Sequence, residues 1–553
     1  MLVVALFGVA LASIQPAQAF ATQPAQTQPA PGLLAWAGCG GPYECATLRV
    51  PLNHADPAGR QVELAVMRRP ALDPAQRIGS LVLNPGGPGG SGIDIARAFA
   101  FALPAEVQQR FDIVGFDPRG VGKSSPLLCH DDIQRLAAIE PAPRSADEWS
   151  ALQRGAQQFA GLCAQRADGV LPFLGSLDVV RDMDRLRIAL GEERLTYLGY
   201  SYGTLLGALY ADQFPTRVRA MVLDGPIDTR MGADELALAQ ASGFERAFAR
   251  FLEDCRTRPC LFARRGDPAA VVDVLMRLVR AKPIAAKSAD RPAGRGETFL
   301  AMIAGMYRPA SWRTLDRAID NALDGDASVI VNLADGLLGR RGATYDNSSE
   351  MNSAVNCLDY TFARDPAHYQ ALAATAELRA PRFGRAFAAS GLGCAYWSSP
   401  PQPLPRIRGA GAPPLLIIAT TNDPATPFEW GLALRTQLQS SVLLTYEGDG
   451  HTAYASGNRC VNDVATRYLV RLDTPADGAI CGTDPEPRMA AQPLPTVAAG
   501  AASIGPAPSE AGAAGTPAQA AEPAAFRYWP YFALGGVVAV GGLVLLVVPR
   551  LRR

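Results

Sequence analysis

The chain has no net charge, few histidines and no closely spaced cysteine pairs of the zinc-binding kind. Lys plus Arg and Asp plus Glu each number 52, and the isoelectric point is near 6.9. The chain as a whole therefore has no excess of positive charge that would attract nucleic acid, and a nucleic-acid-binding function is disfavoured. Only four histidines and no Cys-x-x-Cys pair argue against a zinc site. We expect neither a metal nor a cofactor.

A glycine-rich stretch at residues 84–92 also lacks the spacing of a phosphate-binding loop. No lysine follows the glycines as a P-loop requires, and Pro88 interrupts a dinucleotide fingerprint. The stretch follows a short apolar strand at residues 79–83. Backbone N–H groups in such a loop stabilise the oxyanion of a hydrolase intermediate. We therefore predict that Gly86 or Gly87 supplies one donor of an oxyanion hole.

The ten cysteines form an even set that lies between the two ends of the chain. An oxidising compartment makes five disulfides the default, although sequence alone leaves their connectivity open. Nearest-neighbour pairing would give Cys39–Cys45, Cys129–Cys163, Cys255–Cys260, Cys357–Cys394 and Cys460–Cys481.

Both ends of the chain have features of export. Residues 2–12 form a short apolar run, without a preceding Lys or Arg, and Ala17-Gln18-Ala19 follows as a signal-peptide cleavage site. Residues 531–548 form an uncharged apolar run of roughly the 20 residues that cross a bilayer, with arginines after it. We expect an exported protein tethered to the membrane by a C-terminal helix, or secreted if that tail is processed.

Strand and helix patterns alternate along two stretches that a long helical segment separates. This pattern predicts a mostly parallel sheet flanked by helices, with a large helical cap inserted into it. The expected units are a signal peptide (1–19), a flexible N-terminus (20–32), the first part of an α/β core (33–230), the helical cap (231–405), the second part of the core (406–482), a disordered Ala/Pro linker (483–526), a transmembrane helix (528–549) and a basic cytoplasmic tail (550–553).

The sequence from 195 to 204 is an apolar strand that runs into Gly199-Tyr200-Ser201-Tyr202-Gly203. A strand, this pentapeptide and a helix together predict a nucleophile elbow, which exposes one serine hydroxyl above the sheet. The two glycines are needed because strand and helix backbones approach too closely for a β-carbon. We predict that Ser201 is the nucleophile and that the backbone amide of Tyr202 is the second oxyanion donor.

Asp423 and His451 follow two later strands, which gives the hydrolase order Ser, Asp, His. A serine hydroxyl is a weak nucleophile near neutral pH, so His451 must accept its proton during attack. Asp423 would orient the imidazole and stabilise its cation. The competitors are His54, His130 and His368 for the base and Asp224 for the acid. Asp117 and Arg119 are interpreted as parts of a salt-bridged structural turn.

The chain resembles the secreted tripeptidyl-aminopeptidase-like branch of the α/β hydrolases, which is related to the prolyl aminopeptidases. The matching stretches are residues 50–54, 84–92, 117–120, 199–203, 422–427 and 450–451. The resemblance implies an α/β-hydrolase fold with a TAP-like C-terminal segment, serine acyl-enzyme chemistry without a metal, and peptide substrates with a free N-terminus. Recognition of the substrate ammonium group would need carboxylates in the cap, and Asp359 is a candidate.

Three functions remain open at this level. The first is an exported serine exopeptidase of the tripeptidyl or prolyl aminopeptidase type. The second is a carboxylesterase or lipase that uses the same triad. The third is a non-catalytic surface module that retains the fold.

Overall fold

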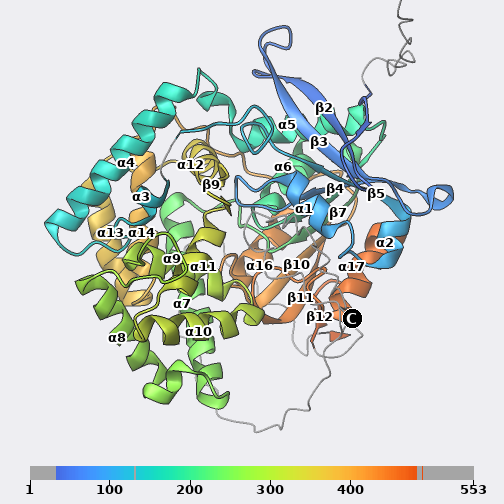
Figure 1. Cartoon of the computed structure of the whole chain (residues 1–553). Helices are drawn as coiled ribbons and strands as arrows, with labels where there is room; N and C mark the ends of the chain where they lie inside the picture. Colours follow the sequence, from blue (N-terminus) through green and yellow to red (C-terminus); the bar gives the residue numbers. More distant parts are fainter. Residues whose placement is uncertain (1–32, 130–132, 483–487, 490–553) are drawn as a thin grey trace, which may run out of the picture.

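The computed structural model of the chain describes residues 33–129, 133–482 and 488–489 (Figure 1). The expected signal peptide, flexible N-terminus, transmembrane helix and basic tail lie outside the described residues, as does nearly all of the expected linker. Within the described ranges, no helix combines the length and the apolar character needed to cross a membrane.

An 11-stranded sheet forms the centre of the molecule (Figure 1). In sheet order its strands are β1 (Ala37–Gly38), β2 (Glu44–Pro51), β3 (Gln61–Arg69), β5 (Phe111–Phe116), β4 (Gly79–Asn84), β6 (Leu195–Tyr200), β7 (Val218–Asp224), β10 (Leu415–Asn422), β11 (Ser441–Asp449), β12 (Ala479–Cys481) and β13 (Arg488–Met489). From β5 to β12 every neighbouring pair is parallel, and the pairs at the two edges are antiparallel. The predicted fold class is confirmed.

Helices cover both faces of this sheet. One face packs against α1 (Gly92–Phe99), α2 (Ala105–Arg110) and α17 (Arg459–Arg471), and the other against α5 (Ser176–Ala189), α6 (Tyr202–Gln213) and α16 (Phe428–Gln437). Strands β4, β5 and β6 are buried at every position. Continuous apolar strands are expected where helices cover both faces of a parallel sheet.

The segment between β7 and β10 is mostly helical and has an apolar core of its own. Its elements are α7 (Ala233–Thr257), α8 (Pro268–Ala281), α9 (Arg295–Met306), α10 (Trp312–Leu323), α11 (Ser328–Leu337), the strands β8 (Arg340–Arg341) and β9 (Thr344–Tyr345), α12 (Ser348–Asp359), α13 (Pro366–Arg379), α14 (Gly384–Ser390) and α15 (Leu392–Ala395). Figure 1 shows these helices gathered beside the sheet, next to α3 (Ile133–Ala137) and α4 (Ala146–Arg166). We call the segment from α7 to α15 the cap.

Five disulfides join the cysteines in the nearest-neighbour pattern, which confirms that pairing. Two of them, Cys255–Cys260 and Cys357–Cys394, lie within the cap. The bridge Cys460–Cys481 joins α17 to β12 at the end of the sheet. Disulfides persist in oxidising compartments, so this set indicates an extracytoplasmic protein.

Candidate active site

Ser201 occupies the sharp turn between β6 and α6. Its backbone has φ 54°, in the left-handed region that a non-glycine residue rarely adopts. The Ser201 N–H donates to the Asp224 carbonyl oxygen at 2.9 Å, which ties the turn to β7. A β-carbon on Gly199 would lie 2.4 Å from the Gly203 oxygen, so only glycine fits there. The turn therefore has the local geometry that the pentapeptide predicts.

The glycine-rich loop after β4 lies directly against this turn. Gly86 and Gly87 have φ 93° and 114°. A β-carbon on Gly86 would come within 2.8 Å of the Ser201 Cβ and 3.1 Å of the Tyr202 nitrogen. Because Gly86 has no side chain, the loop can lie in direct contact with Ser201.

One of the predicted oxyanion donors requires a correction. The Gly86 N–H donates to the Oδ1 atom of Asn84 at 2.9 Å, which engages that amide inside the loop. The prediction that offered Gly86 as a donor is therefore wrong, and its role is steric. Gly87 and Tyr202 are the donors that we retain in the proposal below.

His451 and Asp423 are in direct contact. The Nδ1 atom of His451 lies 2.9 Å from each carboxylate oxygen of Asp423. The buried Asp423 carboxylate also accepts the N–H groups of Ala425 at 2.9 Å and Thr426 at 2.8 Å. Because Nδ1 faces the carboxylate, Nε2 is the ring nitrogen directed elsewhere, and His451 lines the same pocket as Ser201. The arrangement permits proton transfer from a serine hydroxyl.

The competing acid, Asp224, has a different set of partners. Its carboxylate accepts the N–H groups of Ala453 at 2.9 Å and Tyr454 at 2.7 Å, just after His451 in the chain. Burial raises the pKa of Asp224 to about 7. Asp224 therefore anchors the loop that carries His451, and Asp423 is the carboxylate bonded to the imidazole.

The competing histidines are engaged elsewhere. The Nε2 atom of His54 lies 2.9 Å from Asp182, and Asp182 also binds Arg119 at 2.7 Å. His368 pairs with Asp234 in the cap at 2.7 Å. His130 lies outside the described residues. The bond from Arg119 to Asp182 is a structural ion pair, which agrees with the interpretation of Arg119 as part of a structural turn.

The cap holds the His451 loop from the opposite side. The His451 N–H donates to the Tyr307 carbonyl oxygen at 2.8 Å. The two rings meet edge to face with centroids 5.5 Å apart. Arg250 of α7 pairs with Asp449 at 2.9 Å, two residues before the histidine. The position of His451 therefore depends on the cap as well as on the sheet.

Two pockets meet at Ser201. The first, which we call the His451 pocket, has a volume of about 350 Å³ and is lined by His451, Thr452 and Gly86 among others. The second, which we call the Asp234 pocket, has a volume of about 480 Å³ and is lined by Asp234, Tyr202 and Thr426 among others. Both pockets include Gly87, Pro88, Ser201, Tyr307 and Asn352.

The two pockets differ in charge. Among the described residues that line the Asp234 pocket, Asp234 is the only carboxylate, and there is no Lys, Arg or His. The described wall of the His451 pocket contains Arg308 and His451 but no carboxylate. Asp234 is partly exposed and lies 2.7 Å from His368. The site therefore places an anionic group and a cationic group on either side of Ser201.

Asp359 does not have the geometry that the ammonium-binding prediction requires. Its carboxylate is 3% exposed, accepts the Ser176 N–H at 2.9 Å and contacts the Ser176 hydroxyl. Asp359 is not among the described residues that line either pocket. The Ser176 hydroxyl in turn lies 2.6 Å from the hydroxyl of Tyr202. We correct the assignment, since Asp359 supports the elbow from behind instead of facing the substrate space.

Burial of Asp359 also predicts a pH dependence of stability. Burial raises its pKa to about 7, whereas an aspartate in an unfolded chain titrates near about 4. Between these values the folded protein holds a proton that the unfolded chain has lost. The contribution of Asp359 to the free energy of unfolding should therefore fall as pH rises from about 4 to about 7, by on the order of 1 kcal/mol per pH unit.

The variant Asp359→Asn should remove this contribution, so that its stability changes less across that pH range than the stability of the wild type. Denaturant unfolding at pH 4, 5, 6 and 7 measures the difference. The exposed Asp473→Asn variant serves as the control and should keep the wild-type slope. Equal slopes in Asp359→Asn and the wild type would contradict the assignment.

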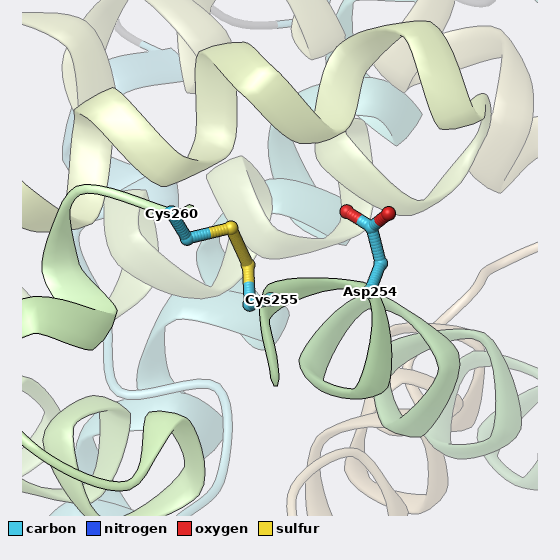
Figure 2. A group of neighbouring side chains, drawn as sticks. All are labelled: Asp254, Cys255 and Cys260. Carbon is cyan, nitrogen blue, oxygen red and sulfur yellow. A yellow bond between two sulfur atoms is a disulfide. The ribbon is translucent and has the colours of Figure 1, made fainter. Parts of the chain in front are cut away.

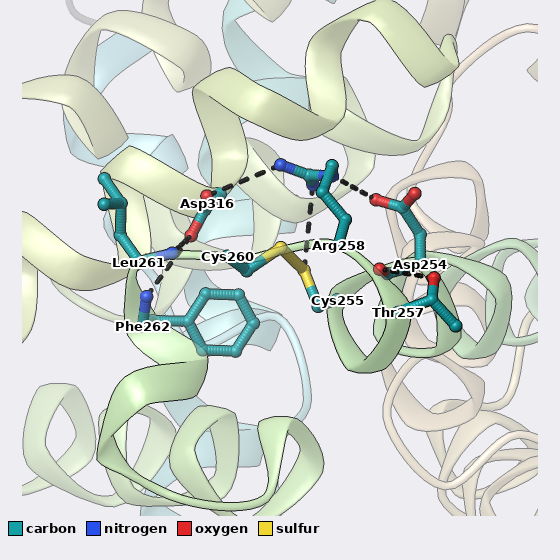
Figure 3. Close-up of a disulfide and its surroundings, with 8 residues drawn as sticks. All are labelled: Asp254, Cys255, Thr257, Arg258, Cys260, Leu261, Phe262 and Asp316. Atoms are coloured by element: carbon teal, nitrogen blue, oxygen red, sulfur yellow. Dashed lines mark hydrogen bonds and ion pairs between the residues drawn. A yellow bond between two sulfur atoms is a disulfide. The ribbon is translucent and has the colours of Figure 1, made fainter. Parts of the chain in front are cut away.

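A group of potential metal ligands, Asp254, Cys255 and Cys260, lies at the end of α7 and in the turn that follows it (Figure 2). Its two sulfur atoms are joined in a disulfide and are therefore not thiolate ligands. Figure 3 shows that Arg258 bridges Asp254, at 2.7 Å, and Asp316. The disulfide and the ion pairs of Arg258 stabilise this turn, and they account for the presence of the two cysteines and the aspartate.

Four residues of the site have no strong signal in the sequence. Thr426 lies 3.0 Å from an Asp423 oxygen and 3.2 Å from His451 Nδ1, and only its place beside Asp423 in the chain hinted at this role. Tyr307, Arg308 and Asp234 come from the cap, where helical periodicity does not show which side chains face the nucleophile. Their positions depend on tertiary packing.

Comparisons with known proteins show to which family the chain belongs. The family model described as TAP-like protein matches residues 380–481, and the model described as alpha/beta hydrolase fold matches residues 79–292. Serine protease Hip1 of Mycobacterium tuberculosis is 37% identical over 456 residues, 79% of this chain and 87% of that protein. Carboxylesterase B of the same organism is 36% identical, with 79% and 86% covered. Tripeptidyl aminopeptidase of Streptomyces lividans is 32% identical over 465 residues, with 81% and 85% covered.

Proposed function

Because the chain belongs to the α/β-hydrolase family and ends its core in a TAP-like segment, we propose that it is an exported serine exopeptidase that hydrolyses peptide bonds near free N-termini. Its relatives include a serine protease and a tripeptidyl aminopeptidase, which supports a serine hydrolase of the peptidase type. The five disulfides support action outside the cytoplasm.

In the proposed mechanism, the Ser201 hydroxyl oxygen attacks the scissile carbonyl while His451 Nε2 accepts its proton. Asp423 holds the imidazole through Nδ1 and stabilises the cation that forms. The N–H groups of Gly87 and Tyr202 stabilise the oxyanion. His451 then returns the proton to the leaving amine, and an acyl-enzyme ester remains on Ser201. A water molecule, deprotonated by His451, hydrolyses this ester and releases the N-terminal peptide.

In this mechanism the two pockets bind the two parts of the substrate on opposite sides of the scissile bond. The leaving amine must lie beside His451, because the imidazolium protonates it. The leaving fragment therefore occupies the His451 pocket. The acyl fragment, which carries the free N-terminus, then occupies the Asp234 pocket, which Tyr202 lines.

The proposal rests on Asp234, the one carboxylate among the described residues that line the acyl-side pocket. Asp234 at the start of α7 would bind the substrate ammonium group, with its position supported by His368 at 2.7 Å. Gln240, Asn352 and Asn356 line the same pocket and add no charge to it. Their NH2 groups donate within the protein, to Ala425, Pro88 and Asn352 respectively. An N-acylated peptide would bring no cation to Asp234 and should bind poorly.

The variant Asp234→Asn tests this assignment. Wild-type protein should hydrolyse free-amine tripeptide p-nitroanilides at least about tenfold better, in kcat/KM, than their N-acetyl forms. Asp234→Asn should lose most of this preference, because activity on the free-amine substrate falls while activity on the N-acetyl substrate stays unchanged. Glu253→Gln, an exposed change on the same helix, is the control. Equal wild-type rates on the two substrates would overturn the proposed function.

An esterase activity on the same triad is the second candidate, favoured by the likeness to Carboxylesterase B. It would hydrolyse simple acyl esters without any need for an amine and would be insensitive to Asp234→Asn. The same substrate panel with p-nitrophenyl esters distinguishes the two. The contact between His451 and Asp423 beside Ser201 argues against a non-catalytic surface module.

A further inference from the structure

We propose that Arg308 binds the C-terminal carboxylate of the leaving fragment, so that the enzyme prefers short peptides cleaved close to their C-terminus. This inference rests on the proposed function, because it assigns the leaving fragment to the His451 pocket. The guanidinium would act as a second anchor, opposite the one that Asp234 supplies. The two anchors together would select substrates by the distance between their ends.

Arg308 is fixed beside the catalytic histidine by the chain itself. It directly follows Tyr307, whose carbonyl oxygen accepts the His451 N–H at 2.8 Å. A β-carbon built on Gly450 would lie 3.4 Å from the Arg308 Cα, which shows how closely the two loops approach. Arg308 lines the pocket together with His451. A ligand group on Arg308 is therefore held on the side of the scissile bond that His451 protonates.

The charge of the pocket suits a carboxylate. Its described wall holds Arg308 and no acidic side chain. Tyr200, which lines the pocket, and Asp224 both act electrostatically on Arg308. The Asp224 carboxylate also accepts the N–H groups of Ala453 and Tyr454. Burial lowers the pKa of Arg308 to about 10, so the guanidinium still carries its charge at neutral pH.

The surroundings of Arg308 combine polar residues with an apolar floor. Ser348, Ser349 and Asn352 line the pocket at the start of α12, where the Ser348 hydroxyl donates to Asp346 at 2.6 Å and the Asn352 amide donates to the Pro88 carbonyl oxygen at 3.3 Å. The apolar part of the wall consists of Ile95, Phe99, Leu300, Leu337 and Leu338. In a partly dehydrated site, a carboxylate bound by the planar guanidinium fork is held more strongly than in water. The volume of about 350 Å³ suits a short leaving fragment with an apolar side chain.

Matched peptides that differ only at the C-terminus test the proposal. Tetrapeptides and pentapeptides with free N-termini are prepared as C-terminal acids and as C-terminal amides, and kcat/KM is measured by mass spectrometry of the products. Wild-type protein should prefer each acid over its amide by about tenfold or more. Arg308→Gln should reduce that ratio to about one by slowing acid cleavage alone, and Arg308→Lys should keep part of the preference. The exposed Arg313→Gln variant is the control and should behave as the wild type.

A second measurement keeps the proposal testable if Arg308→Gln fails to fold. Short apolar peptides should inhibit the wild type about tenfold more strongly as acids than as amides. Equal cleavage of acids and amides by the wild type, or equal inhibition, would overturn the role of Arg308. If a preference for free amines persists in that case, the proposed function stands. Equal cleavage of free and N-acetylated peptides would instead remove the proposed function.

Discussion

Replacing Ser201 by Ala should lower kcat for peptide and ester substrates by on the order of 10⁵- to 10⁶-fold. The reason is that, in the proposed mechanism, this hydroxyl forms the acyl-enzyme. The residual rate should come from the oxyanion donors and substrate binding alone. Steady-state hydrolysis of a free-amine tripeptide p-nitroanilide measures the loss. KM should change far less than kcat, because the substrate still meets Asp234 and the backbone of Gly87.

The matched control for this change is Ser353→Ala. Ser353 lines the Asp234 pocket from α12 and donates to the Ser349 carbonyl oxygen at 3.2 Å, away from the proposed proton transfer. Its replacement should leave kcat within a few-fold of the wild type. Ser201→Ala should unfold near the wild-type temperature, since alanine keeps the β-carbon and leaves the backbone strain at φ 54° unchanged. Well-folded Ser201→Ala protein with undiminished activity would remove Ser201 from the mechanism.

Replacing Asp423 by Asn should lower kcat by about 10⁴-fold with the fold intact. The amide cannot hold the imidazole in the tautomer that accepts a proton at Nε2, and it does not stabilise the imidazolium. Asp224→Asn is the comparison, because this residue is equally buried and also ends a strand. The Ala453 nitrogen lies 3.1 Å and 2.9 Å from the two carboxylate oxygens, so the NH2 group of an asparagine would face this N–H donor and repel it. We expect it to lower the unfolding temperature and to reduce kcat about tenfold or less.

Measurement of kcat and of the unfolding midpoint for both variants separates the two acids. An inactive but stable Asp423→Asn variant and an active but destabilised Asp224→Asn variant would support the assignment. The reverse pattern would transfer the role of the acid to Asp224. The geometry makes the first result the expected one, because the Nδ1 atom of His451 lies 2.9 Å from Asp423.

The sequence predicts much of this site because local chemistry determines it. The elbow needs Gly199 and Gly203, since strand and helix backbones nearly touch there. Asp423 and His451 follow strands whose carboxyl ends must meet at one edge of a parallel sheet. The nearest-neighbour cysteine pairs are also local, with separations of 5 to 37 residues. Each of these features depends on a short stretch of chain.

One error concerns a place where distant segments meet, and the other a contact within a single loop. Asp359 was proposed from its position in the cap, but α12 turns its carboxylate toward Ser176 of the core. Gly86 was proposed as an amide donor, but the neighbouring Asn84 side chain takes up that donor. Helical periodicity gave no indication that Asp234 and Arg308 line opposite pockets. Packing of the cap on the sheet decides these positions, and a sequence pattern does not encode it locally.

The proposed function requires that peptides with a free N-terminus acylate Ser201. A tripeptidyl phosphonate ester, prepared with a free amine and with an N-acetyl group, tests this requirement through its rate of covalent labelling and the mass spectrometry of the labelled peptide. We expect the label on Ser201 and a rate at least about tenfold higher for the free-amine reagent. A label on another residue, or equal rates for the two reagents, would overturn the proposed function.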